Sequence, residues 1–135
     1  MGIIIEEPGF LPRYSGFQNL WLLAQIRRTI SKEQVSAVME LVGLDPKSRK
    51  HVGKYSMGMR QRLGIAQAIM EEPELLLLDE PFNGLDQSGV EEMRALFQEK
   101  AASGVTILLA SHHGEDIDHL CATVHRMDSG ILTEV

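Results

Sequence analysis

Two short apolar segments, separated by a segment of helix length, most constrain the fold of this chain. Residues 75–78 are four consecutive leucines, and residues 105–110 read Val-Thr-Ile-Leu-Leu-Ala. Each segment is too short for a helix and is typical of a strand that is buried on both faces. Between them, Ser88 begins a predicted helix that extends to about Ala102, and Gly104 ends it. Alternating strands and helices imply a parallel sheet with crossover helices, so the sequence predicts an α/β fold.

The first part of the chain is predicted to be mainly helical. Ser31 and Gln34 have the spacing of a capping box, in which the two residues satisfy each other's free backbone amides. Ser15 and Ser56 are also suited to cap helices. The predicted elements there are a strand at 3–5 and helices at about 15–28, 31–42 and 57–70. A short helix at about 115–120 and strands at 122–127 and 131–135, around a Ser129-Gly130 turn, complete the pattern.

Charge and composition narrow the classes of partner. The formal net charge is −6, whereas binding to a nucleic-acid backbone requires a basic surface. No nucleic-acid partner is therefore expected. No apolar segment approaches the roughly 20 residues that a membrane-spanning helix needs, so no direct membrane insertion is expected. The N-terminus lacks the pattern of a secretory signal, and Cys121 is the only cysteine, so a reducing cytosol is the expected location.

Asp79 and Glu80 follow directly after the leucine segment and carry the strongest chemical signal. Ligands of open α/β sheets bind at the carboxyl ends of the strands, which is where these two acids would lie. An Asp in that position can hold Mg²⁺, and a neighbouring Glu can polarise an attacking water. The alternative is a strand that ends in two solvated acids. The continuation at 82–86, Phe-Asn-Gly-Leu-Asp, favours the functional interpretation.

Two further segments are weaker indicators of a phosphate site. Ser56 and Gly58 lie at a predicted helix start, where free backbone amides and the helix dipole favour an anion. Most helices capped by serine bind nothing, so the alternative is an ordinary capped helix. His112 follows the predicted strand at 105–110 and is placed to contact a γ-phosphate or to orient a water. A single histidine after a strand is more often a surface or packing residue, and His113 beside it leaves the choice open.

The order and spacing of these segments resemble those of the ATP-binding cassette (ABC) transporter ATPases. The resemblance covers essentially the whole chain. The matching segments are 7–20 after the Q-loop, 55–59 at the signature motif, 75–80 at Walker B, 83–86 at the D-loop, His112 at the switch histidine, and 127–132 at the closing hairpin.

The resemblance implies a fold and a division of the chain. The expected fold is α/β, an incomplete P-loop NTPase-type (RecA-like) parallel sheet with crossover helices plus an ABC-type α-helical subdomain. Residues 1–135 would form a partial ABC ATPase domain. Within it, about 10–72 would be the helical subdomain, and 1–9 and 73–135 the remainder of the core.

The resemblance also implies roles at the hydrolytic site, with ATP and Mg²⁺ as cofactors. Asp79 would bind Mg²⁺, and Glu80 would be the catalytic base. His112 would sense the γ-phosphate as a second catalytic residue. Glu6, or Glu7 one residue on, stands at the position of the Q-loop glutamine, where a carboxylate can still reach Mg²⁺ through a water.

A second group of residues would act across a dimer. Ser56 and Gly58, with Met59 beside them, would contact the γ-phosphate of an ATP held mainly by a second ABC ATPase subunit. Asp86 would communicate between the two subunits. The helical subdomain would dock on a transmembrane permease subunit, which places the chain in the cytoplasm, peripheral to the inner face of the cell membrane. The sequence Tyr-Ser-Met-Gly-Met at 55–59 resembles forms found in the peptide-export and drug-resistance branches of the family.

One expected motif does not occur in the sequence. A phosphate loop reads Gly-x-x-x-x-Gly-Lys-Ser/Thr between a strand and a helix. The only Gly-Lys pair is Gly53-Lys54, with Ser48 in place of the first glycine and Tyr55 in place of the hydroxyl residue. Because that loop supplies most donors to the phosphates, we expect negligible ATPase activity from this chain alone. The alternative function is a non-catalytic interaction module that pairs with a complete ABC ATPase or docks on membrane subunits.

Overall fold

The structure, a computed structural model, describes residues 2–4, 9–28, 30–110, 125–128 and 131–134. The helices are α1 (Gly16–Arg27), α2 (Lys32–Leu41), α3 (Met57–Ile69) and α4 (Gln87–Ala102), with a short 3₁₀ turn, η1 (Val52–Lys54). The strands are β1 (Gly2–Ile4), β2 (Leu75–Asp79), β3 (Thr106–Ala110), β4 (His125–Asp128) and β5 (Ile131–Glu134). The described helices and strands match those predicted to within a few residues, whereas the helix predicted at 115–120 lies outside the described residues.

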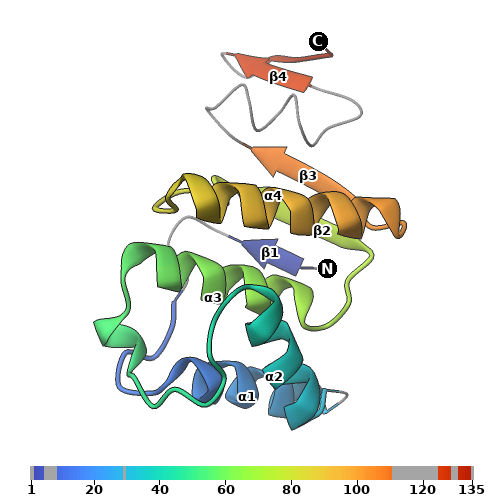
Figure 1. Ribbon diagram of the computed structural model, residues 1–135. Helices are drawn as coiled ribbons and strands as arrows, with labels where there is room; N and C mark the ends of the chain where they lie inside the picture. The colour runs from blue at the N-terminus through green and yellow to red at the C-terminus, as the bar shows by residue number, and fades with distance from the viewer. Residues whose placement is uncertain (1, 5–8, 29, 111–124, 129–130, 135) are drawn as a thin grey trace.

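The strands β1, β2 and β3 form a parallel sheet in that order (Figure 1). Ile4 pairs with Leu78, and Asp79 pairs with Ala110, so the carboxyl ends of all three strands lie at one edge. The crossover from β2 to β3 runs through α4, which confirms the predicted strand–helix–strand unit. Strands β4 and β5 form a separate antiparallel pair.

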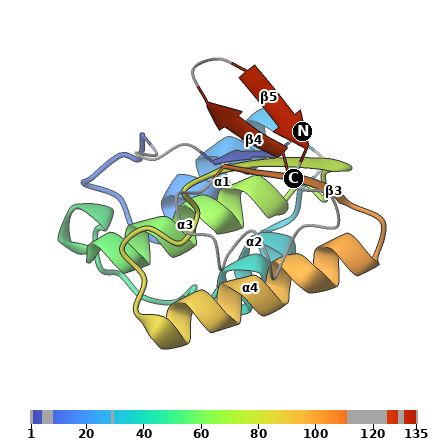
Figure 2. The ribbon, with the colours of Figure 1, turned by 90° about the horizontal axis from the view of Figure 1, so that it is seen from above.

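Among the described residues, helices cover one face of the sheet. In Figure 2, α3 and α4 lie on the same side of the three strands. Leu76 and Leu78 point to that side and are buried, because side chains alternate between the two faces of a strand. On the opposite face, Leu108 is 56% exposed. The prediction that these strands are buried on both faces is therefore wrong for this face.

Helices α1 and α2 begin at the capping residues that the sequence predicts, Ser15 and Ser31. Ser15 and Ser31 each accept a hydrogen bond from the backbone amide three residues on, and Gln18 and Gln34 complete two capping boxes. The buried carboxamide of Asn19 binds the preceding loop, accepting from the Leu11 amide and donating to its carbonyl. Helix α1 packs on α2, α2 packs on α3, and α3 packs against β1 (Figure 1). None of the helices in the described part of the chain has the length and apolar run needed to cross a bilayer.

Helix α4 begins at Gln87, one residue before the predicted start at Ser88. Asp86, not Ser88, is its N-cap, and the Asp86 carboxylate accepts a hydrogen bond from the Gly89 amide at 2.8 Å. Both residue types are good caps, but only Asp86 immediately follows the turn that leaves β2. The predicted bounds of α4 are therefore confirmed to within one residue.

Candidate functional site

Asp79 and Glu80 lie where the sequence predicts, at the carboxyl end of the central strand. Asp79 is the last residue of β2 and is exposed. The Glu80 amide donates to the Ala110 carbonyl at 2.8 Å, which holds Glu80 against the end of β3. Glu80 has a φ of 47°, the left-handed region that L-residues seldom adopt. Such a conformation costs about 1 kcal/mol or more and persists only where surrounding contacts hold it.

The chain after Glu80 forms a turn that connects β2 to α4. The Asn83 amide donates to the Glu80 carbonyl at 3.2 Å, and Gly84 has a φ of 79°, which suits glycine. Phe82 is buried and packs against Phe97 of α4, with ring centroids 5.8 Å apart. Asp86 then caps α4, so its carboxylate is engaged within its own chain. The turn is thus anchored at both ends.

The predicted phosphate-binding helix start is formed by α3. Ser56 is its N-cap, and the Ser56 hydroxyl oxygen accepts from the Met59 amide at 3.1 Å. The first backbone bond of helical spacing is donated by Arg60 to the Ser56 carbonyl. The amides of Met57 and Gly58 precede it and are among the donors that a helix leaves without an internal partner. The Met59 side chain is half-buried and packs on the core.

The structure brings the start of α3 and the turn after β2 into contact. A Cβ added at Gly58 would lie 3.0 Å from the Gly84 carbonyl oxygen. A Cβ added at Gly84 would lie 2.5 Å from the Cγ atom of Met57. Glycine at position 58 therefore permits a close approach to the backbone of Gly84, whereas a side chain at position 84 would meet the side chain of Met57. Ser56, Gly58, Asp79 and Glu80 belong to one packed unit, although about twenty residues separate the two segments.

Gln61 also joins these two segments, and sequence reasoning did not find it. It lies on α3 and is 4% exposed. Its Nε2 atom donates to the Pro81 carbonyl at 2.8 Å and approaches the Glu80 carbonyl at 3.4 Å. The sequence does contain one indication of a buried polar residue. Gln61 lies four positions before Ile65, on a helix face that is otherwise apolar.

Two predicted site residues, Glu6 and His112, lie outside the described residues. They follow β1 and β3 in the sequence, and these are the strands that flank β2. No group of three or more metal-ligating side chains gathers in the described ranges. A single exposed carboxylate, Asp79, nevertheless suits Mg²⁺, which keeps several waters and takes one or two carboxylates together with substrate phosphates.

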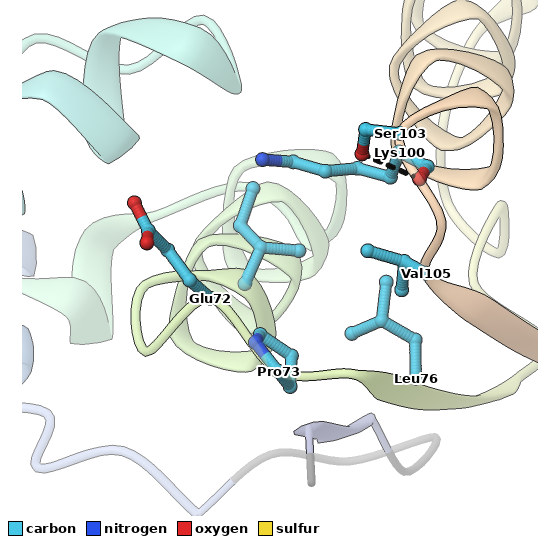
Figure 3. A pocket seen from close by; sticks show the side chains of 7 residues that line it. Glu72, Pro73, Leu76, Lys100, Ser103 and Val105 are labelled. Carbon is cyan, nitrogen blue, oxygen red and sulfur yellow. Dashed lines mark hydrogen bonds between the residues drawn. The ribbon is translucent and has the colours of Figure 1, made fainter.

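A small cavity of about 190 Å³ lies at the opposite end of the sheet (Figure 3). Leu76, near the start of β2, and Val105, just before β3, contribute apolar walls, and the side chains of Glu72 and Lys100 extend beside them. The other lining residues are Ile69, Pro73 and Ser103. Because Asp79 and Glu80 lie at the carboxyl ends of the strands, this cavity is separate from the candidate site.

Comparison with known proteins agrees with this arrangement. The sequence profile of the ABC transporter family matches residues 1–83, which is more than half of the chain. The chain belongs to the ABC transporter family. The matched region runs from β1 to Asn83 in the turn after β2, so it contains Ser56, Gly58, Asp79 and Glu80.

Curated relatives extend the match over nearly the whole chain. The chain is 45% identical to the bacitracin transport ATP-binding protein BcrA of Enterococcus faecalis, over 99% of this chain and 44% of that protein. It is 42% identical to the uncharacterized ABC transporter ATP-binding protein YybJ of Bacillus subtilis, over 98% and 61% of the two. It is 36% identical to the lantibiotic transport ATP-binding protein SrtF of Streptococcus pyogenes, over 89% and 52%. The chain thus spans between 44% and 61% of the length of these relatives.

Proposed function

We propose that these residues form part of the ATP-hydrolysing subunit of an ABC transporter. One observation carries the proposal: the helix start at Ser56–Gly58 packs against the turn that follows Asp79 and Glu80. An anion-binding helix start and a pair of acids at a strand end are the parts from which phosphoryl transfer to water can be built.

Asp79 and Glu80 are proposed to act on one side of a bound nucleotide. Mg-ATP, when bound, supplies the phosphoryl group that is transferred to water. Asp79 is the proposed Mg²⁺ ligand because its carboxylate is exposed at the strand end. Glu80 is proposed to orient and deprotonate the attacking water. The bond from its amide to Ala110 holds its backbone beside Asp79.

The start of α3 is proposed to act on the nucleotide of a second ABC ATPase subunit. The first-turn amides of Met57 and Gly58, together with the positive end of the helix dipole, favour the γ-phosphate. The Met57 side chain is 68% exposed, which leaves this end of α3 accessible to a partner. Ser56 and Met59 share this turn. Asp86 is the proposed contact residue across the dimer.

The core is proposed to be an incomplete RecA-like sheet completed by further polypeptide. The division into a helical subdomain at about 10–72 and a core at 1–9 and 73–135 stays a prediction. Support comes from β3, which is an edge strand of the described sheet and whose residues Thr106, Leu108 and Ala110 are exposed. An exposed apolar strand favours association. A segment that carries the phosphate loop and is not among these 135 residues is the proposed occupant.

A permease subunit is the proposed partner of α1. The helix carries apolar residues on nearly all sides, and Leu22 and Ile26, one turn apart, are 43% and 76% exposed. A helix that is apolar all round normally has protein covering it. This docking would hold the chain at the cytoplasmic face of the membrane. Ile26→Asp is expected to prevent copurification with the permease without changing the helix content of the chain. Copurification at the wild-type level would contradict the assignment.

The proposed cargo is a compound of the class named for the relatives, bacitracin or a lantibiotic. The support is sequence identity to BcrA and SrtF, at 45% and 36%. Cells that carry the transporter are expected to tolerate one of these compounds better than cells that carry Glu80→Gln. Equal tolerance of both strains to both compounds would rule this cargo class out.

ATP hydrolysis is the direct test of the proposed function. The 135-residue chain alone is expected to show negligible turnover, whereas the assembled transporter hydrolyses ATP. In that assembly, Glu80→Gln is expected to lower kcat by about 100-fold or more, the usual contribution of a general base. Glu74→Gln, an exposed acid just before the start of β2, is the matched control and should leave kcat unchanged.

Two results would contradict the proposal. Measurable turnover by the chain alone that Glu80→Gln abolishes would show that no further phosphate-binding segment is required. An assembled transporter in which Glu80→Gln and Glu74→Gln have the same kcat would show that Glu80 is not the base.

A further inference from the structure

Gln61 is a buried polar side chain that joins the two halves of the candidate site. Its Nε2 atom donates to the Pro81 carbonyl at 2.8 Å, in a contact that is itself buried. The Glu80 carbonyl lies 3.4 Å from the same atom. A carboxamide nitrogen carries two hydrogens, so it can serve both carbonyls. Gln61 is therefore held where it is by its hydrogen bonds as well as by packing.

These contacts restrain the backbone around Glu80. The two carbonyls belong to the peptide units that follow Glu80 and Pro81, and the proline ring fixes the φ of Pro81. The Pro81 side chain is fully buried. Glu80 itself has a φ of 47°. Holding the peptide unit after Glu80 thus helps to maintain this unfavourable conformation, on which the direction of the Glu80 side chain depends.

The same side chain is rigidly connected to the start of α3. Gln61 lies five residues after the N-cap Ser56, within one continuous helix. Because the intervening backbone is hydrogen-bonded, a displacement of the first turn moves Gln61 with it. A second contact also joins the start of α3 to this turn, because Gly58 packs against the Gly84 carbonyl. That contact is with a residue four positions after Glu80, so it does not hold Glu80 directly.

We propose that Gln61 is a positioning residue that couples the position of the Ser56 end of α3 to the orientation of Glu80 in the same chain. The catalytic consequence rests on the proposed function. A phosphate that contacts the helix start would change the geometry of the Glu80 carboxylate, which activates water. Coupling of this kind is reciprocal, so the state of the Glu80 turn also changes the helix start.

The first test measures coupling without nucleotide. Amide NMR signals of the 135-residue chain are compared for wild type, Ser56→Ala, Gln61→Met and the double variant. Methionine keeps the length and volume of glutamine and removes the donor. We expect Ser56→Ala to shift the Glu80 and Asn83 signals in wild type. At least half of that shift should be lost when Gln61 is methionine, because the connection is absent.

Two further variants keep this test decisive. Gln67→Leu replaces a half-buried glutamine on the same helix and should leave the effect of Ser56→Ala unchanged. Gln61→Leu, which also has no donor, should behave like Gln61→Met, and it takes the place of Gln61→Met if the methionine variant does not fold. A purely structural role of Gln61 predicts additive shifts. Additive shifts, or no shift at Glu80 from Ser56→Ala, would overturn the proposal.

The second test uses ATP hydrolysis by the assembled transporter. Gln61→Met should lower kcat by about tenfold or more, because misplacement of a catalytic group by a fraction of an ångström has effects of this size. The KM for ATP should stay within about twofold, since Gln61 does not contact nucleotide. If the wild-type assembly hydrolyses ATP and Gln61→Met has the same kcat, the positioning role is overturned but the proposed function is not. A wild-type assembly without turnover would instead refute the proposed function, while the NMR measurement still decides the coupling.

Discussion

Arg62 provides the sharpest prediction about what holds the helical segment to the sheet. Its Nη1 atom donates to the Val42 carbonyl at the end of α2 and to the Glu92 carboxylate on α4, both at 2.9 Å. The guanidinium passes between two glycines. A Cβ at Gly43 would lie 2.6 Å from Nη1, and a Cβ at Gly89 would lie 2.9 Å from Nη2. One side chain thus connects α2, α3 and α4.

The magnitude follows from the two bonds. The Arg62 side chain is 18% exposed, whereas that of Glu92 is 53% exposed. A hydrogen bond from a charged donor to a sheltered carbonyl contributes about 1.5–3 kcal/mol. An ion pair with an exposed partner contributes about 0.2–1 kcal/mol. Arg62→Met should therefore lower the free energy of unfolding by about 2–4 kcal/mol. Glu92→Gln, which leaves the Val42 bond in place, should lower it by about 1 kcal/mol or less.

Urea denaturation followed by tryptophan fluorescence measures both values, because Trp21 is the only tryptophan and lies on α1. The two variants should give parallel transitions, with the midpoint of Arg62→Met at lower urea. If Arg62→Met and Glu92→Gln are equally stable, the Val42 bond contributes nothing, and the assignment of Arg62 as the connection between α2 and α4 is refuted.

Two further predictions concern Gly84 and Tyr55. Gly84→Ala and Gly104→Ala both place alanine at positive φ, but only Gly84 has a neighbour, Met57, within contact distance. The Gly84→Ala variant should therefore lose about 0.5–1.5 kcal/mol more stability than Gly104→Ala, because the exposed Met57 side chain must change its rotamer. Urea denaturation measures both losses, and equal losses would refute the Met57 contact. Burial raises the pKa of the Tyr55 hydroxyl above 10.0, despite a hydrogen bond to the Gly16 backbone. The folded state disfavours the ionised form, so stability is complete below pH 10.0 and falls as pH rises towards the folded pKa. The stability of Tyr55→Phe should therefore fall less steeply than that of wild type as pH rises above 10.0. An unchanged slope would show that other groups cause the alkaline loss.

Features that depend on a few neighbouring residues could be predicted well. Ser31 and Gln34 form the predicted capping box, because its geometry needs only one helical turn. The strand that ends at Asp79 was predictable because four consecutive leucines are too short for a helix and too apolar for a loop. The start of α4 was predicted to within one residue, but the choice of Asp86 as its N-cap depends on the path of the preceding turn.

Features that depend on distant parts of the chain could not be predicted. No local pattern shows that Gln61 binds the Pro81 carbonyl, because the two residues are brought together only when α3 packs beside the turn after β2. The exposure of Leu108 on one face of the sheet has the same origin. A strand sequence indicates which residues share a face, but only the packed structure shows which face the helices cover.

The sequence by itself determined the chemistry and order of the candidate site: two acids after a strand, and a serine and a glycine at a helix start. These depend on residue type and on local hydrogen bonds, which a short segment specifies. The tertiary structure decided that the two segments touch, through Gly58 and Gly84, and that Gln61 holds the backbone at Glu80. The reason is physical. A local bond needs only its own turn, whereas a contact across about twenty residues exists only after burial of the apolar core has positioned the helix beside the sheet.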